Sequence, residues 1–378
     1  MIQRPLFKSF FQGGFECSTH RRKDFRRLDV ISATRHDIYA ESDYALLNDI
    51  GLHTIRDGLR WHLIEKSPGF YDWSSVLPML QAADRVGTQV IWDLFHYGWP
   101  DHLDIWSPSF VESYAAYAGA TARFMRDASS TTPVLVPVNE ISFTAWAGGQ
   151  FNVFNPFGEG RGNELKEQLV RAAIAGMEAI WTVDPAIRFA HVEPAIHVLP
   201  DANDESTVAL ATTYNEAQFQ AWDMLSGILK PELGGSPRYM DIVGINYYCH
   251  NQWTLNGGPI EVTDPMAKSF ARMLVENYKR YGRPIFVAET GIEAELRPSW
   301  FRHVCSEVKS ALIAGVPVQG ICLYPILNHP GWDDDRHCPN GLVDYSPVTF
   351  ERSFDQALLS ELQRQQVEFT AIMPSLIV

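Results

Sequence analysis

The stretch Pro284-Ile285-Phe286-Val287-Ala288-Glu289-Thr290-Gly291 decides the fold class. It is an apolar run that passes directly into a carboxylate and then reaches a glycine. An unbroken apolar run of this kind indicates a strand buried on both faces, as in a parallel sheet. A carboxylate is costly to bury, so an acid at the end of such a strand needs either a partner or a chemical role.

The same arrangement occurs earlier in the chain. Residues Pro133-Val134-Leu135-Val136-Pro137-Val138-Asn139-Glu140 form an apolar run that ends in an asparagine and an acid. Two glutamates at the carboxyl ends of two buried strands suggest the carboxylate pair that cleaves glycosidic bonds. Glu140 and Glu289 are therefore the candidate catalytic residues.

Strand-like segments alternate with helix-like segments along the whole chain. This pattern predicts one (β/α)8 barrel, a TIM barrel of the α/β class, with residues 1–378 as a single catalytic domain. A doubly wound open sheet is the alternative, but it usually brings a phosphate-binding loop, and neither GxGxxG nor GxxxxGK[ST] is present. The predicted strands are residues 10–17, 53–59, 88–95, 133–139, 187–193, 240–247, 284–289 and 318–325, and the predicted helices are 38–50, 74–87, 109–128, 164–183, 204–230, 264–281, 298–315 and 353–367.

Polar residues gather where the predicted strands end, which is where the active site of such a barrel lies. Aromatic residues cluster at the same ends, and aromatic rings stack well on the C–H faces of sugars. In chain order these polar and aromatic residues are Glu16, His20, Arg56, Asp57, His96, Asn139, Glu140, Glu193, Asn246, Tyr248, Glu289 and Trp332.

The composition excludes some classes of protein. The chain has 378 residues and a formal net charge of −14, whereas a nucleic-acid-binding protein normally has a basic face. No apolar run approaches the roughly 18 residues that span a membrane, and there is no signal-peptide core. The five cysteines are scattered and form no CxxC pair. We therefore expect reduced thiols and a cytoplasmic location, with no nucleic-acid or membrane partner.

Taken together, the motifs resemble the clan A glycoside hydrolases, and within them the family-1 β-glucosidases, over residues 10–345. Asn139-Glu140 matches the family's Asn-Glu-Pro motif, and Ala288-Glu289-Thr290-Gly291 stands for its Thr-Glu-Asn-Gly. The most literal match is 241–248, and 10–14, 54–61 and 93–100 resemble the motifs of the first three strands. The chain departs from the family at Ile141, at Thr290 and at Tyr324-Pro325, which take the places of a proline, an asparagine and a Trp-Ser pair.

The resemblance implies a retaining β-glycosidase that acts on a small-molecule glycoside or oligosaccharide without a cofactor. Glu289 is expected to be the nucleophile, ionised and held by Arg56 and the Tyr248 hydroxyl. Glu140 is expected to be the acid/base, with a pKa raised by burial and by the Glu289 charge. The other expected substrate-binding residues are Glu16, His96, Asn139, Asn246 and Trp332, with Asn139 on the sugar 2-hydroxyl and His96 on another hydroxyl of the same sugar.

Alternatives within and outside this class remain. An endo-acting clan A glycanase would use the same two acids. A sugar-binding protein without turnover would not need both of them. A metal-dependent hydrolase would draw its ligands from one crowded loop that lacks a His-x-His pattern, so we expect no metal site. The sugar, its leaving group and the oligomeric state stay open. The crowded loop that a metal-dependent hydrolase would use contains His329, Asp333, Asp335, His337 and Cys338.

Overall fold

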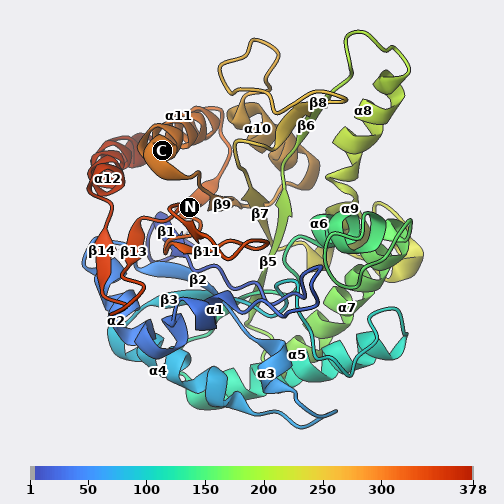
Figure 1. Cartoon of the computed structure of the whole chain (residues 1–378), viewed down its shortest axis with the longest axis vertical. Coiled ribbons are helices and arrows are strands. Elements are labelled where there is room, and N and C mark those ends of the chain that lie inside the picture. Colours follow the sequence, from blue (N-terminus) through green and yellow to red (C-terminus); the bar gives the residue numbers. More distant parts are fainter. Residues whose placement is uncertain (1–4, 377–378) are drawn as a thin grey trace.

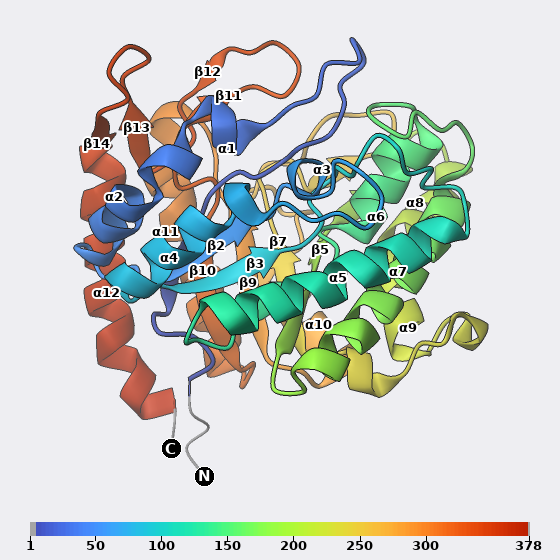
Figure 2. The ribbon, with the colours of Figure 1, turned by 90° about the horizontal axis from the view of Figure 1, so that it is seen from below.

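The computed structural model describes residues 5–376 and confirms the predicted (β/α)8 barrel (Figures 1 and 2). Neighbouring strands pair in parallel all the way around, and the last strand pairs with the first, which closes the sheet. All of the predicted strands are present. They are β1 (Phe11–Gly14), β2 (Thr54–Gly58), β3 (Gln89–Asp93), β4 (Val134–Val136), β5 (Arg188–Pro194), β7 (Ile242–Asn246), β9 (Ile285–Thr290) and β10 (Val318–Leu323).

Helices surround the barrel at the predicted places, with one correction. The single helix predicted over 204–230 is two helices, because the α-helical hydrogen bonding is interrupted at Gln218 and Phe219, where the Phe219 N–H bonds the Glu216 carbonyl three residues back. The side chain of Gln218 accepts a hydrogen bond from the Ile196 N–H and donates one to the Asn215 carbonyl, so it ties this break to the loop after β5. The long helices are α2 (His36–Asn48), α4 (Leu77–Val86), α5 (Ser109–Ala128), α7 (Gly162–Val183), α8 (Thr207–Ala217), α9 (Gln220–Ser226), α10 (Phe270–Tyr281), α11 (Arg297–Ile313) and α12 (Gln356–Leu376).

Short elements that the sequence pattern did not predict fill the connections. Two of them, β6 (His197–Leu199) and β8 (Gln252–Thr254), pair in parallel beyond the carboxyl ends of β5 and β7. The connection after β4 holds the short helix α6 (Ile141–Thr144) and the π-helical turn η2 (Ala145–Gln150). The others are α1 (Val30–Ala33), α3 (Trp61–Ile64), η1 (Trp73–Ser75), η3 (Pro231–Leu233), η4 (Pro237–Tyr239), η5 (Ala294–Leu296), β11 (His329–Pro330), β12 (His337–Cys338), β13 (Val343–Tyr345) and β14 (Arg352–Phe354).

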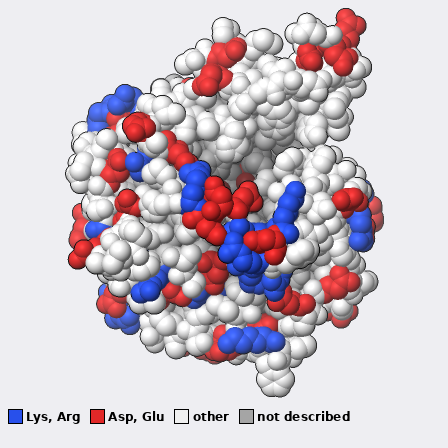
Figure 3. Space-filling model, in the orientation of Figure 1, with Lys and Arg blue, Asp and Glu red and all other residues white. Residues whose placement is uncertain are grey.

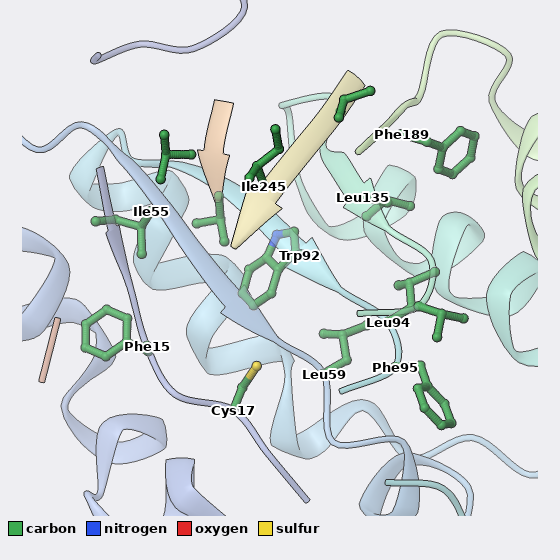
Figure 4. Packing of buried hydrophobic residues seen from close by; sticks show 14 of the residues in the cluster. Phe15, Cys17, Ile55, Leu59, Trp92, Leu94, Phe95, Leu135, Phe189 and Ile245 are labelled. Atoms are coloured by element: carbon green, nitrogen blue, oxygen red, sulfur yellow. The ribbon is translucent and has the colours of Figure 1, made fainter. Parts of the chain in front are cut away.

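The alternation of side chains along the strands builds two apolar layers. In β3, Ile91 packs inside the barrel with Val134, Phe286 and Phe7. The next residue, Trp92, packs in the larger outer cluster between the barrel and the helices. Figure 4 shows this outer layer, where the labelled side chains of neighbouring strands meet. Because both faces of the sheet are buried, polar side chains of the strands can reach a ligand only at the strand ends.

Two further expectations concern membranes and thiols. In the part of the chain that the structure describes, no helix has both the length and the apolar character to cross a membrane. The five cysteines are free, as their spacing predicted.

Candidate active site

A cavity of about 710 Å3 lies at the carboxyl ends of the barrel strands. Its lining includes both candidate catalytic glutamates, and Figure 3 shows the hollowed face of the molecule on which the strands end. Residues 140 and 289 are far apart in the sequence, so only the closed barrel brings them to one cavity. The predicted site residues in the cavity wall are Glu16, His96, Glu140, Tyr248, Glu289 and Trp332.

A β-bulge aims Glu289 at this cavity. Ile245 of β7 pairs with Val287 of β9, but the next residue, Asn246, pairs with Glu289, so β9 has one extra residue at Ala288. Strict alternation would turn Glu289 outward with Val287, which packs against the helices. A bulge re-aims the following side chain, and it places this carboxylate over the barrel mouth.

Two donors hold the Glu289 carboxylate. Arg56 Nη1 donates to Oε1 at 2.6 Å, and the Tyr248 hydroxyl donates to Oε2 at 2.8 Å. The predicted contact between Arg56 and Glu289 is therefore confirmed. Each carboxylate oxygen has its own donor, which fixes the orientation of the group in the cavity.

Arg56 uses all five of its N–H groups, the full number that a guanidinium carries. Besides Glu289, it donates to both oxygens of Asp93 at 3.0 and 2.6 Å, to Asn139 Oδ1 at 2.6 Å and to the Ala288 carbonyl at 3.3 Å. Arg56 and Asp93 are fully buried. One cation thus organises the ends of β2, β3, β4 and β9.

Glu140 sits in a strained turn. It precedes α6 with a φ of +46°, a conformation that non-glycine residues rarely adopt. Its backbone N–H donates to the Val192 carbonyl of β5 at 3.0 Å, which holds the turn against the sheet. Its Oε1 accepts a hydrogen bond from Asn246 Nδ2 at 2.8 Å, and its Oε2 accepts one from the Tyr97 hydroxyl.

Asn139 hydrogen-bonds to its neighbours at the end of β4, and its expected contact with the sugar 2-hydroxyl stays a prediction. Asn139 is fully buried and is not part of the cavity wall. Its Nδ2 lies 3.0 Å from the Tyr97 hydroxyl and 3.2 Å from His96 Nε2, while its Oδ1 accepts from Arg56. In the structure this amide holds its neighbours in place. Asn246 is also buried and outside the cavity wall, and its hydrogen bond orients the Glu140 carboxyl.

His96 and Glu16 form the polar floor on the β1 and β3 side. His96 Nδ1 lies 2.7 Å from Asp93 Oδ2, and its Nε2 lies 3.9 Å from Glu16 Oε1. Burial lowers the pKa of His96, but the hydrogen bond and charge of Asp93 and the charge of Glu16 outweigh burial, and the net shift is upward. Burial raises the pKa of Glu16, but the two nearby histidines and the hydrogen bonds from Ser18 reverse the shift, so Glu16 stays ionised at neutral pH.

The carboxyls of Glu140 and Glu289 have raised pKa values. Burial raises the pKa of Glu140, against the hydrogen bonds from Tyr97 and Asn246, as the sequence predicted. Burial also raises the pKa of Glu289, to about 7, because the Arg56 charge offsets only part of the desolvation and the Glu140 charge adds to it. The Arg56 charge and the Tyr248 hydrogen bond act in the expected direction, since both lower the pKa of Glu289, but burial has the larger effect.

Three residues around the site were not among the expected catalytic or substrate-binding residues, although Glu193 was one of the polar residues noted at the strand ends. Asp93 is an acid at the end of its strand, β3, and this is the same sequence signal that identified Glu140 and Glu289. Tyr97 has a φ of +66° and bonds Glu140, but nothing in the sequence marks it apart from its neighbours. Glu193 ends β5, is buried, and accepts the Ser142 N–H at 3.0 Å. Burial raises the pKa of Glu193 to about 8.

The departures from the family motifs have structural roles around this site. The Tyr324 ring lies beneath the guanidinium, with Arg56 Cζ 5.3 Å from the ring centroid, a favourable cation–π distance. Thr290 points toward α11, where its hydroxyl accepts a hydrogen bond from Trp300 Nε1 at 2.9 Å. Ile141 is buried at the start of α6.

The acidic loop does not assemble as a metal site within residues 5–376. Asp335 pairs with Arg22 and Arg26, and His337 lies 2.8 Å from Asp344. In that described part of the chain, the one group with metal-ligand spacing is Cys17, Asp93 and His96. Asp93 already forms an ion pair with Arg56 there, so its carboxylate is used within the protein and is not free to bind a metal ion.

Comparison with known proteins shows the fold but assigns no sequence family. No family model matches the chain, and no curated protein is similar to it in sequence. Among solved structures, the chain is similar to the family 1 β-glucosidase from Thermotoga maritima in complex with isofagomine lactam, with 14% identity, coverage of 96% of this chain and 98% of that chain, and a TM-score of 0.75. It is similar to the AHE enzyme from Alicyclobacillus herbarius, with 14% identity, coverage of 97% and 100%, and a TM-score of 0.78. It is also similar to the virulence factor SghA from Agrobacterium tumefaciens, with 16% identity, coverage of 95% and 97%, and a TM-score of 0.76. These likenesses extend over nearly the whole of each chain, and at such identities what they show is a shared barrel fold.

Proposed function

We propose that this protein is a retaining β-glycosidase in which Glu289 is the nucleophile and Glu140 is the acid/base. The observation that carries the proposal is that the two carboxyls, from the ends of β4 and β9, line one cavity, and that Glu289 is clamped by Arg56 and Tyr248. The likeness to a β-glucosidase solved with isofagomine lactam supports a small-molecule glycoside as the partner. The whole chain would act as one catalytic unit.

In the first step, a carboxylate oxygen of Glu289 attacks the anomeric carbon and Glu140 gives its proton to the leaving oxygen. The C–O bond to the leaving group breaks, and a covalent glycosyl-enzyme forms. Retention requires the two carboxyl groups to lie about 5 Å apart. The contacts of Glu289 with Arg56 and Tyr248 keep the nucleophile facing the sugar, so little reorganisation is needed at the moment of attack.

In the second step, Glu140 removes a proton from water, and the water oxygen displaces Glu289. Formation of the ester has removed the Glu289 charge, which lowers the pKa of Glu140 and suits it to act first as an acid and then as a base. Tyr97 and Asn246 hold its two oxygens throughout.

Before the first step, one carboxyl of the pair Glu140 and Glu289 must be protonated and the other must be ionised. Arg56 is the cation in direct contact with the pair, and it touches Glu289, whereas Glu140 receives hydrogen bonds from the neutral groups of Tyr97 and Asn246. A cation in contact stabilises the anion more than a neutral donor does. We therefore assign the negative charge to Glu289 and the proton to Glu140 in the active state.

The proposal is tested with aryl β-glycosides and the variant Glu289→Ala. We expect turnover to be abolished, with the fold intact by circular dichroism, and we expect azide to restore release of the aryl group with formation of an α-glycosyl azide. Nuclear magnetic resonance should show the β anomer as the first product of the wild-type enzyme. Glu295→Ala, at an exposed glutamate, is the matched control. Near-normal turnover by Glu289→Ala, or an inverted first product from the wild type, would contradict the assignment.

A further inference from the structure

The cavity extends well beyond the two glutamates. Its volume of about 710 Å3 lies in the range of pockets that enclose a whole drug-sized ligand, roughly 300–1,000 Å3, and exceeds what one sugar ring fills. The additional space lies among α6, η2, the start of α7, α8 and β8. We call this part the outer lobe. It is lined by Phe143, Trp146, Ile196, Tyr214, Trp253 and Leu255.

A row of aromatic rings leads from Glu140 to the protein surface. The Tyr97 hydroxyl bonds Glu140, and the Tyr97 ring centroid lies 5.6 Å from that of Phe143. Phe143 lies 5.9 Å from Trp146, and Trp146 lies 5.3 Å from Phe151. Each step is a normal aromatic contact distance. The row therefore provides a continuous apolar path that starts at the proposed acid/base.

The outer end of this row is exposed to water. Trp146 and Phe151 are 45% and 49% exposed, and both belong to the connection after β4 that carries Glu140. In Figure 3 the hollowed area beside the central charged side chains is largely uncharged. A contiguous exposed apolar surface that continues into a cavity is typical of a ligand-binding groove.

Most of the wall of the outer lobe is apolar, and two of its polar side chains, Asn251 and Gln218, hydrogen-bond within the protein. Asn251 accepts the Tyr248 N–H and donates to the Ala195 carbonyl at 2.8 Å. Gln218 is bonded to the backbone at Ile196 and Asn215 in the same way. A second sugar ring would need hydrogen bonds from these groups, because its hydroxyls lose water on entry. The lobe is better matched to an apolar group.

We propose, on the basis of the function assigned above, that the natural substrate is a β-glycoside whose leaving group is an extended apolar chain or aryl group, and that this group lies in the outer lobe along Phe143 and Trp146. The side of the sugar on which the leaving group lies follows from the chemistry. Glu140 must protonate the leaving oxygen, so the leaving group departs on the Glu140 side of the sugar, and that is the side on which the aromatic row begins.

Binding tests the proposal independently of turnover. The probes are methyl, hexyl, octyl and decyl 1-thio-β-D-glucosides, kept below micelle-forming concentrations and measured by titration calorimetry. Each buried methylene should tighten binding about two- to fourfold, so octyl, with seven more methylenes, should bind at least about a hundredfold more tightly than methyl. The gain should level off once the chain has passed Phe151 and lies in water.

Two lobe variants and one control locate the effect. Trp146→Ala and Trp253→Ala should weaken octyl binding roughly tenfold each, because each removes a large apolar contact. They should also flatten the dependence of binding on chain length. Phe70→Ala removes an aromatic ring that is 78% exposed and not in the cavity wall. It should change neither the affinity for the octyl glucoside nor the dependence of binding on chain length.

The outcomes separate this proposal from the proposed function. Binding that does not change with chain length, or faster hydrolysis of cellobiose than of octyl β-D-glucoside in kcat/KM, overturns the apolar leaving group even if aryl glycosides are hydrolysed. A clear chain-length dependence that disappears in Trp146→Ala supports the outer lobe. If that dependence is found but no glycoside of the screen is hydrolysed, the apolar lobe stands and the assignment of hydrolysis fails.

Discussion

Replacing Arg56 by lysine should damage both stability and activity although it keeps the positive charge. Arginine makes five hydrogen bonds here, and lysine has three donors on a single nitrogen. At least two bonds are therefore lost. Since a hydrogen bond to a charged group contributes about 1.5–3 kcal/mol, the free energy of unfolding of Arg56→Lys should fall by about 3–6 kcal/mol.

Arg56→Met should cost more, because it leaves Asp93 and Glu289 without their common cation. Removing one partner of a buried ion pair costs about 3–5 kcal/mol, and here two carboxylates depend on one partner. Asp93→Asn added to Arg56→Met should recover part of the loss, since one of the stranded charges is then gone. The Arg56 charge lowers the pKa of Glu289, so its removal should raise that pKa and move the acidic limb of the pH–rate profile to higher pH.

Urea unfolding followed by circular dichroism measures these changes. The matched control is Arg188→Lys, because Arg188 also grips a carboxylate through two nitrogens, at Asp241, but its side chain is 41% exposed. We expect that control to cost less than about 1 kcal/mol. Equal losses for Arg56→Lys and Arg188→Lys would show that the five-bond arrangement does not hold the site together.

Three more predictions concern the acids. Glu140→Ala should slow alkyl glycosides far more than activated aryl glycosides, because only poor leaving groups need protonation, and equal slowing would indicate a structural role. Glu193 has a pKa near 8 in the folded protein and 4.5 in the reference state, so the folded state binds more protons between these values and stability should fall as pH rises through this window. Glu193→Gln should reduce that slope in urea midpoints measured at pH 5 and pH 8, and an unchanged slope would assign it to other groups. EDTA should leave activity unchanged, and a loss restored by a divalent ion would point to Cys17, Asp93 and His96.

The strand ends could be predicted because their signals are local. A run of apolar residues followed by an acid, as at 133–140 and 284–291, identifies a buried strand and its functional end within eight residues. The contact of Arg56 with Glu289 was also predictable, since a buried carboxylate needs a positive partner and strand two carries one. Helix 204–230 was predicted too long because nothing in the helical pattern marks the break at Gln218, which is made by contacts with the loop after β5.

The role of Asn139 could not be predicted from its own motif. The motif places it beside Glu140, but its amide is engaged by Arg56, His96 and Tyr97, which come from two other strands and their ends. The upward shift of the pKa of Glu289 could not be predicted for a related reason. The sequence indicates the neighbouring charges, whereas the cost of complete burial depends on how tightly the barrel closes around them.

The sequence by itself determined the class of the fold, the order of its strands and the two glutamates, because apolar periodicity and the cost of an isolated buried acid are properties of short segments. The tertiary structure alone decided the direction in which each side chain points and what surrounds it. The bulge that turns Glu289 into the cavity depends on how β9 registers against β7, and register is set by pairing between segments about 40 residues apart. The outer lobe depends on connections from α6 to β8 that pack against one another only after the barrel has closed.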